Sequence, residues 1–251
     1  MKDKFVLGID IGGSGIKGAI VNVKTGKMKT KRYRVPTPDP STPDAVVNAI
    51  NKIAEKFKWK GPIGVGFPGV IQHGVVKTAA NIDDGWLDVN LEKLMNKQTG
   101  NPCIALNDAD VAGMAEMKYG AGIKNKGVVI MLTIGTGIGC VLFTQGKIVP
   151  NCEWGHIALP GGIDDAEKWA SDAARKKYKL DWDEWMSRLE TYVKYVEDMF
   201  WPDLIIIGGG LAKKLGDGIP FKTRVKTVPA QLLNEAGIIG AAVAAKKLLK
   251  E

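Results

Sequence analysis

The feature that most constrains this chain is a strand–glycine turn–strand pattern that occurs twice. The first copy spans Phe5–Val23, with its turn at Asp10–Gly15. The second copy spans Gly127–Thr144, with its turn at Gly135–Gly139. Because each copy heads about half of the chain, we expect a duplicated architecture of two α/β lobes and not a solenoid of short repeats.

Hydrophobic periodicity and the positions of proline predict the remaining elements. Residues 36–43 contain four prolines, which lack the backbone donor that regular structure needs, so a loop is expected there. The apolar patterns predict further strands at 28–35, 63–67 and 204–207, and helices at 44–58, 109–119, 184–200 and 236–249. With 45% hydrophobic and 25% charged residues, the chain can bury an ordinary globular core.

The first glycine turn matches two nucleotide-binding patterns only in part. Residues 13–18 follow the spacing GxGxxG, but that fingerprint must open a helix, and the short β-branched run after it predicts a strand. A Walker A loop is excluded because no Gly-Lys pair is followed by Ser or Thr. Glycine hairpins can instead bring bare backbone amides close to phosphate oxygens.

Asp10, directly before the first turn, bears on this interpretation. Its carboxylate would repel phosphate unless a hard cation lay between them, and Mg²⁺ held through water meets that need. The pair of turns therefore favours a phosphate site. The alternative is that both turns are simple tight hairpins and that Asp10 caps one of them.

Four motifs resemble, in their order along the chain, the repressor/ORF/kinase (ROK) family of sugar kinases. They are Gly8–Gly18, Asn107–Ala109, Gly135–Gly139 and Glu153–His156. The resemblance covers essentially the whole chain. It implies an α/β fold of the two-lobe, actin-like and ribonuclease-H-like kind found in hexokinases, with the active site in the cleft between the lobes.

The same resemblance implies where the lobes divide. A smaller N-terminal lobe would comprise residues 1–107 and the C-terminal helix at about 236–251. A larger C-terminal lobe would comprise residues 108–235. Many family members are homodimers, so a homodimer is expected here as well.

Within the family, the C-terminal half resembles bacterial polyphosphate glucokinases. The similar segments are Asp165–Ser171, Trp182–Trp185, Trp201–Leu204 with the glycines that follow at 208–210, and Val228–Leu232. Many other members carry a zinc-binding CxCGxxGC cluster after the Glu-x-Gly-His motif, whereas residues 157–165 contain no cysteine, so no zinc site is expected. The implied activity is transfer of the terminal phosphoryl group of inorganic polyphosphate, with ATP as an alternative or additional donor, to the 6-hydroxyl of glucose. The alternative is an ATP-dependent ROK hexokinase that acts on glucose, mannose or another hexose.

The resemblance also implies roles for individual residues. Asp108 matches the general base that accepts the proton of the sugar's primary hydroxyl, although capping of the helix that follows is the structural alternative. The expected sugar contacts are Asn107, Asp108, Glu153, His156 and Glu167, with Gly69 and Asn81 as weaker candidates. The expected phosphate contacts are Asp10, Gly12, Gly13, Ser14, Gly15, Lys17, Thr133, Gly135, Thr136, Gly137, Gly209 and Gly210. Asp10 would also hold Mg²⁺ through water.

The formal net charge of +8 favours a polyanionic partner, although general solubility explains it as well. A basic track for polyphosphate could involve Lys17, Arg175–Lys177, Lys213–Lys214 and Lys222–Lys226. No zinc-finger spacing and no RNP-like strand occurs, so nucleic acid is not expected as a partner.

Two further classes of protein are weighed against the kinase. Repressors of the same family place a helix-turn-helix domain ahead of the first glycine turn, and the eleven residues before Gly12 leave no room for one. A pure sugar-binding module would need neither a base at Asp108 nor two phosphate turns. No apolar run reaches the ~20 residues of a membrane span, and no signal-peptide pattern is present. With three separated cysteines, expected as buried and reduced thiols, these features predict a cytoplasmic enzyme without a membrane partner.

Overall fold

The computed structural model describes residues 4–80, 82–216 and 218–249. The chain divides into two compact units, the first made of Met1–Ala115 with Glu235–Glu251 and the second of Glu116–Asn234. The change from one unit to the other falls within helix α3 (Asp108–Tyr119). The boundary predicted from the sequence, between residues 107 and 108, lies at the start of this helix.

The first unit is built on a mixed sheet with the strand order β3-β2-β1-β5-β8, in which β4 also pairs with β2. Strand β1 is antiparallel to β2, whereas β1, β5 and β8 run parallel to one another. A separate two-stranded hairpin is formed by β6 and β7. The elements of this unit are β1 (Phe5–Gly12), β2 (Gly15–Asn22), β3 (Lys27–Met28), β4 (Tyr33–Val35), α1 (Pro43–Lys56), β5 (Ile63–Phe67), β6 (Ile71–Gln72), β7 (Val75–Val76), α2 (Leu91–Thr99), β8 (Cys103–Asn107), most of α3, and α8 (Ala236–Ala244).

The first glycine turn is a hairpin, as predicted. Strands β1 and β2 pair in register from Phe5 opposite Asn22 to Gly12 opposite Gly15, so only Gly13 and Ser14 form the connection. No helix follows this turn, which confirms that its GxGxxG spacing is not a dinucleotide fingerprint.

The prediction of one strand at 28–35 is wrong in one respect, because the structure has two short strands there, β3 and β4. Met28 lies opposite Val21 and Tyr33 opposite Gly18, so this side of the ladder uses two more residues than β2 over the same length. The surplus residues loop out of the ladder. The hydroxyl of Thr30 accepts a hydrogen bond from Ile20 N at 3.1 Å and so satisfies a donor at the break.

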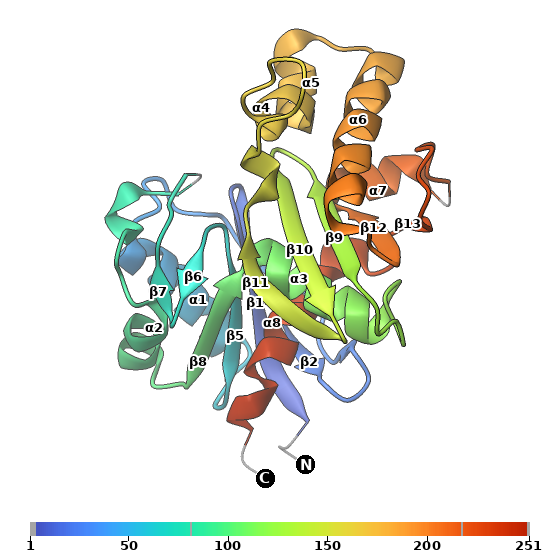
Figure 1. Ribbon diagram of the computed structural model, residues 1–251. Helices are drawn as coiled ribbons and strands as arrows, with labels where there is room; N and C mark the ends of the chain where they lie inside the picture. The colour runs from blue at the N-terminus through green and yellow to red at the C-terminus, as the bar shows by residue number, and fades with distance from the viewer. Residues whose placement is uncertain (1–3, 81, 217, 250–251) are drawn as a thin grey trace. The chain divides into compact units, whose positions relative to one another are not determined.

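Helix α8 lies on β1 and β5, and Figure 1 shows it in red beside the blue first strand. Gly8 of β1 and Gly64 of β5 are neighbours in the parallel register. A Cβ atom at either position would lie closer than 3.0 Å to a backbone carbonyl oxygen of α8, which leaves no room for a side chain. The helix backbone therefore rests directly on the sheet. On the opposite face of β1, Ile9 packs in the hydrophobic core with residues of α1 such as Ile53.

The predicted C-terminal helix is confirmed with a shorter α-helical part. Helix α8 ends at Ala244, and Ala245–Leu248 form a tighter 3₁₀ segment. Helix α8 consists mostly of alanine, glycine and isoleucine, and its buried residues lie on all sides of the helix. This is typical of a helix enclosed by the core.

The second unit repeats the strand order of the first. Its sheet has the order β11-β10-β9-β12-β13, with β9 antiparallel to β10 and parallel to β12, and β12 parallel to β13. Each sheet therefore begins with a hairpin and continues with parallel strands, which confirms the predicted duplication. The elements are β9 (Val129–Ile134), β10 (Ile138–Thr144), β11 (Lys147–Cys152), α4 (Ala166–Ala170), α5 (Asp172–Tyr178), α6 (Trp182–Phe200), β12 (Leu204–Gly208), α7 (Gly209–Leu215) and β13 (Thr227–Pro229).

Helix α6 is the longest helix among the described residues and packs on the second core. It begins two residues earlier than expected because the Asp181 side chain caps it, accepting a hydrogen bond from Glu184 N at 2.8 Å. Trp185 is fully buried, and its ring nitrogen donates to the carbonyl oxygen of Ala170 at 2.8 Å. Among the cysteines, Cys103 and Cys140 are buried as predicted, whereas Cys152 is only half-buried.

A test of this packing is the substitution Gly64→Ala. The added methyl group would overlap the backbone of α8, so we expect a loss of about 3 kcal/mol of stability. That loss corresponds to a fall in Tm of roughly 10 °C for a chain of this size. The measurement is thermal unfolding followed by circular dichroism. The control is Gly13→Ala, where a Cβ atom meets nothing within 4 Å, and where we expect little change. If the two variants unfold at the same temperature, the close contact of α8 with the sheet is wrong.

Candidate functional site

Predicted site residues of the first unit gather at the carboxyl ends of its parallel strands. Asp10 of β1 lies in register with Gly66 of β5, which in turn pairs with Leu106 of β8, one residue before Asn107. In open α/β sheets, ligands bind beyond this edge. The predicted residue Asn81 lies outside the described residues.

Asn107 connects two of the predicted sugar-binding segments. Its side chain is 9% exposed, and its amide nitrogen donates to the carbonyl oxygen of Gly69 at 3.2 Å. Its amide oxygen accepts hydrogen bonds from the backbone nitrogens of Ala109 and Asp110 at 2.8 and 3.1 Å. Asn107 is thus the residue that caps helix α3.

This capping bears on the role of Asp108. Asp108 is the first residue of α3 and is half-buried at the sheet edge. Its carboxylate also accepts a hydrogen bond from Ala109 N at 2.7 Å, but that donor is already satisfied by Asn107. The start of the helix therefore does not require a carboxylate at position 108, which weakens the structural alternative to a catalytic role.

Asp10 faces α8 and lies opposite Lys17 in the hairpin. The ammonium nitrogen of Lys17 is 3.6 Å from Oδ2 of Asp10. Burial raises the pKa of Asp10 above its ordinary value, and the charges of Lys17 and Arg32 oppose that shift. A Cβ atom at Gly237 would lie 3.0 Å from Oδ1, so the carboxylate lies against the first turn of α8.

A partly exposed carboxylate of this kind fits Mg²⁺. The ion binds proteins through one or two carboxylates and keeps several waters, which allows phosphate oxygens to complete its shell. The Asp10 side chain is 21% exposed and so can meet water or a ligand. In the described part of the chain, no three or more His, Cys, Asp or Glu side chains form a metal-binding group, and no helix is long and apolar enough to cross a membrane.

Two residues that the sequence did not reveal hold the first glycine turn. Thr37 donates its hydroxyl hydrogen to the carbonyl oxygen of Gly12 at 2.5 Å, and Arg34 donates from its guanidinium to the carbonyl oxygen of Ser14. The Arg34 guanidinium lies against Gly15, so a side chain at position 15 would displace it. Arg34 reaches the turn through the pairing of β4 with β2, where it lies opposite Lys17.

In the second unit, the predicted phosphate residues meet at the ends of β9 and β12. Thr133 pairs with Gly139 on one side and with Gly208 on the other, and Gly209 forms a bridge to Ile134. Gly209 has a φ of +73°, and a Cβ atom there would overlap the backbone of Ile134. Glycine is therefore required where α7 begins beside the second turn.

Glu167 links the second glycine turn to helix α4. Its Oε2 atom accepts a hydrogen bond from Ile138 N at 2.7 Å. A Cβ atom at Gly137 would lie 2.5 Å from the same oxygen, so a side chain there would displace the Glu167 carboxylate from the turn. Glu167, predicted as a sugar contact, thus also holds the turn predicted to bind phosphate.

Glu153 and His156 lie in the segment that follows β11, and Glu153 is close enough to both His156 and Glu167 for an electrostatic interaction with each. Desolvation by the surrounding protein raises the pKa of Glu153, with His156 opposing the shift and Glu167 adding to it. The Nδ1 atom of His156 is 3.2 Å from Oδ2 of Asp165. Because an ionised carboxylate only accepts, Nδ1 is the donor, and Nε2 of a neutral ring is left as an acceptor.

Asp165 was not among the predicted site residues, yet it orients one of them. Its Oδ1 atom caps α4 by accepting from Lys168 N at 3.0 Å, while its Oδ2 atom contacts His156. Partial burial acts to raise the pKa of Asp165, but the hydrogen bonds from Lys168 and His156 outweigh it and hold the pKa below its ordinary value. Asp directly before a short helical run is a typical N-cap residue, but only the folded chain brings His156 to it.

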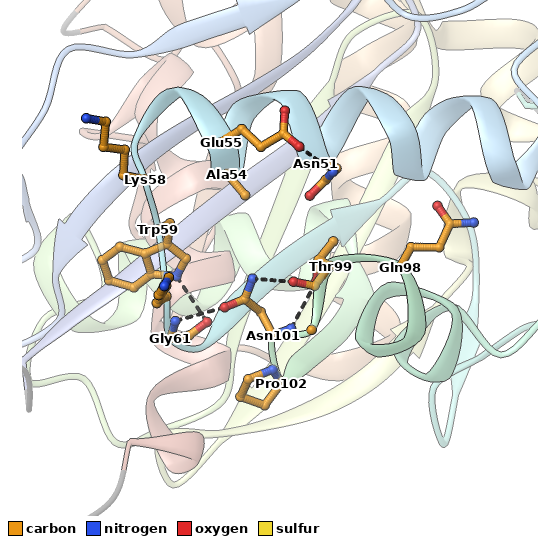
Figure 2. Close-up of a pocket in the computed structure, with 12 residues that line it drawn as sticks. Asn51, Ala54, Glu55, Lys58, Trp59, Gly61, Gln98, Thr99, Asn101 and Pro102 are labelled. Atoms are coloured by element: carbon orange, nitrogen blue, oxygen red, sulfur yellow. Dashed lines mark hydrogen bonds between the residues drawn. The ribbon is translucent and has the colours of Figure 1, made fainter.

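One cavity of the first unit lies away from these residues. It has a volume of about 660 Å³ and is lined by the end of α1, by Trp59 and by the segment before β8 (Figure 2). Figure 2 shows Asn101 at its wall, where the side chain accepts from Gly61 N at 2.9 Å and donates to Thr99 O at 3.0 Å. These residues precede β5 and β8, at the opposite sheet edge from Asp108.

The chain is similar in sequence and in structure to known proteins. The model of the ROK family matches residues 6–177. Polyphosphate glucokinase of Mycobacterium tuberculosis is 43% identical over 239 residues, which are 94% of this chain and 89% of that protein. The crystal structure of inorganic polyphosphate/ATP-glucomannokinase from Arthrobacter sp. strain KM is 46% identical, with a TM-score of 0.89 over 95% of this chain and 97% of that one.

A more distant structure shows how widely the fold is shared. The ROK family glucokinase of Streptomyces griseus, in complex with glucose and AMPPNP, is 23% identical, with a TM-score of 0.78 over 97% of this chain and 99% of that one. The predicted fold class is confirmed, since these neighbours are hexokinase-type sugar kinases. The chain belongs to the ROK family.

Proposed function

We propose that this chain is a polyphosphate glucokinase, which transfers the terminal phosphoryl group of inorganic polyphosphate to the 6-hydroxyl of glucose. The observation that carries the proposal is the 43% identity to a polyphosphate glucokinase over 94% of the chain. The arrangement of Asp108 and Asn107 at the sheet edge supports it, because a carboxylate is positioned there that helix capping does not require.

In the proposed reaction, Asp108 acts as the general base. Its carboxylate accepts the proton of the 6-hydroxyl while that oxygen bonds to the terminal phosphorus. The bond from phosphorus to its bridging oxygen breaks, and the polyphosphate leaves one phosphate shorter. A carboxylate suffices for this step because the transition state of phosphoryl transfer is loose and the proton can leave late.

The remaining roles follow the predictions from the sequence. Glu153, His156 and Glu167 bind sugar hydroxyls, together with Asn107, Gly69 and Asn81. The two glycine turns bind donor phosphates. Asp10 would hold Mg²⁺ through water, and the ion would supply positive charge that offsets the charge of the phosphates. Lys17, paired with Asp10, supplies positive charge of its own.

A broader activity is the second candidate. The name of the Arthrobacter relative, 46% identical over 95% of this chain, includes both polyphosphate and ATP as donors and both glucose and mannose as substrates. ATP as an additional donor and mannose as an additional acceptor therefore belong to the proposal. We also propose a homodimer, which light scattering would test, and a cytoplasmic location, which cell fractionation would test.

A panel of donors and acceptors tests the proposed activity. Purified protein is assayed for hexose 6-phosphate with polyphosphate or ATP, each with glucose or mannose, and with or without EDTA. We expect the highest kcat/KM with polyphosphate and glucose, a loss of activity on removal of Mg²⁺, and a weaker preference for polyphosphate as salt rises, because salt screens a polyanion's contacts. Activity with ATP alone would exclude polyphosphate as a donor.

The substitution Asp108→Asn tests the general base. We expect kcat to fall roughly 10²- to 10⁴-fold, because the amide cannot accept the proton. The melting temperature should stay close to that of the wild type, since Asn107 still caps α3. Asp88→Asn is a matched control on the same unit, where the carboxylate is 79% exposed and pairs only at the surface with Lys77. Substantial turnover by Asp108→Asn would reject Asp108 as the base.

The substitution Asp165→Asn tests whether Asp165 orients His156. Asparagine keeps an oxygen that can cap α4 but loses the charge that holds the imidazole. We expect the KM for glucose to rise about fivefold, which corresponds to about 1 kcal/mol of lost hydrogen bonding, with a smaller change in kcat. The adjacent Asp164→Asn serves as the control. Equal KM values in both variants and the wild type would show that His156 does not depend on Asp165.

A further inference from the structure

Asp172, at the start of α5, gathers three cationic side chains. Its carboxylate lies 2.9 Å from Nε of Arg175, 2.8 Å from Nζ of Lys176 and 3.1 Å from Nζ of Lys214. Arg175 and Lys176 belong to α5, whereas Lys214 belongs to α7. We call these four residues the Asp172 cluster. It carries three positive charges and one negative charge, so a surplus of positive charge is concentrated at one place in the second unit.

The Asp172 cluster adjoins the second glycine turn. The backbone nitrogen of Asp172 donates a hydrogen bond to the carbonyl oxygen of Gly135 at 2.9 Å. Helix α7, which supplies Lys214, begins at Gly209, and that residue bridges Ile134 at the end of β9. Both helices that supply the cations are therefore attached to the turn at which a donor phosphate is expected.

Other basic segments suggested by the sequence have acidic partners of their own. Arg224 lies 2.7 Å from Asp198 and 3.8 Å from Glu197. The pKa of Glu190 is lowered, first by a hydrogen bond from the Lys194 side chain and then by one from the backbone of Lys222, with the charges of both lysines adding to the shift. These cations are balanced by carboxylates of α6, whereas in the Asp172 cluster three cations share one carboxylate.

The cations of the cluster are held in place but remain accessible. The guanidinium carbon of Arg175 and the ammonium nitrogen of Lys214 each lie 5.1 Å from the ring centre of the buried Trp185, which attracts both cations. The side chains of Lys176 and Lys214 are 69% and 43% exposed. Burial acts to raise the pKa of Asp172, but hydrogen bonds from the three cations hold it far below its ordinary range, so the anchor stays ionised.

We propose that the Asp172 cluster binds the part of a linear polyphosphate chain that extends beyond the phosphates at the Gly135 turn, and that it makes long polyphosphate a better donor than ATP. This inference rests on the proposed function. Holding several cations together is unfavourable through mutual repulsion, and a chain of phosphates that neutralises them relieves it. Each phosphate contact also releases bound counterions, which makes binding sensitive to salt.

The test is the double variant Lys176→Gln/Lys214→Gln. These substitutions remove both exposed charges and leave Arg175 to pair with Asp172. The control, Lys194→Gln/Lys147→Gln, removes two charges of the same unit that belong to no candidate site: Lys194 pairs with Glu190, and Lys147 is exposed on β11. KM and kcat are measured with long-chain polyphosphate, tripolyphosphate and ATP at several salt concentrations, and thermal unfolding confirms that both variants are folded.

For the cluster variant, we expect the KM for long-chain polyphosphate to rise about tenfold at low salt, while kcat changes little. The KM for ATP should change less than twofold. The salt dependence of log(kcat/KM) with polyphosphate should become shallower by about 0.7 for each lost contact. The control should match the wild type.

Three results would overturn the inference. They are an unchanged KM for long-chain polyphosphate, an equal rise for ATP and polyphosphate, and an equal rise in the control variant. Failure of the proposed function looks different, because the wild-type protein itself would then give no product from polyphosphate, and the inference would fall with it. If the wild type uses polyphosphate and the cluster variant behaves like it, the role of the Asp172 cluster is rejected and the proposed function stands.

Discussion

The contact of helix α8 with the glycine pair Gly8 and Gly64 is the constraint on which the first unit depends. Because neither position can hold a side chain, the helix backbone lies directly on β1 and β5. This close approach also brings the start of α8 to Asp10, where Gly237 leaves room for the carboxylate. A larger residue in the glycine pair would lift the helix and change the surroundings of Asp10. The packing of the core and the geometry of the proposed donor site thus depend on the same two glycines.

In the second unit, carboxylates that accept backbone hydrogen bonds hold the loops and turns in place. Glu167 holds the second glycine turn, and the fully buried Glu116 accepts from the backbone nitrogens of Ala121, Gln231 and Leu232. A buried carboxylate without such donors would be costly, and with them it fixes loops that have no regular structure. Asp172 differs because its partners are charged side chains that also face solvent. Some acidic residues of the second unit therefore stabilise the backbone, whereas Asp172 belongs to a cluster suited to ligand binding.

The two sheets have the same strand order but contribute different chemistry. The first sheet supplies the candidate base at the end of β8, where Asn107 performs the capping. The second supplies the candidate sugar contacts Glu153 and His156 and the Asp172 cluster. A duplicated scaffold can specialise in this way because the side chains that differ between the two units lie at or beyond the strand ends, whereas the repeated pattern lies in the strands themselves.

The sequence by itself determined the paired glycine hairpins, the duplicated strand pattern and the family, and with the family the candidate base Asp108. These features are local, since glycine spacing and β-branched runs constrain the backbone over a few residues. The split of β3 from β4, the contact of Arg34 with the first turn, the pairing of His156 with Asp165 and the gathering of cations from α5 and α7 at Asp172 were decided by the tertiary structure. Each depends on segments that meet only when strands pair or helices pack, and the sequence spacing between such segments carries no information about their approach.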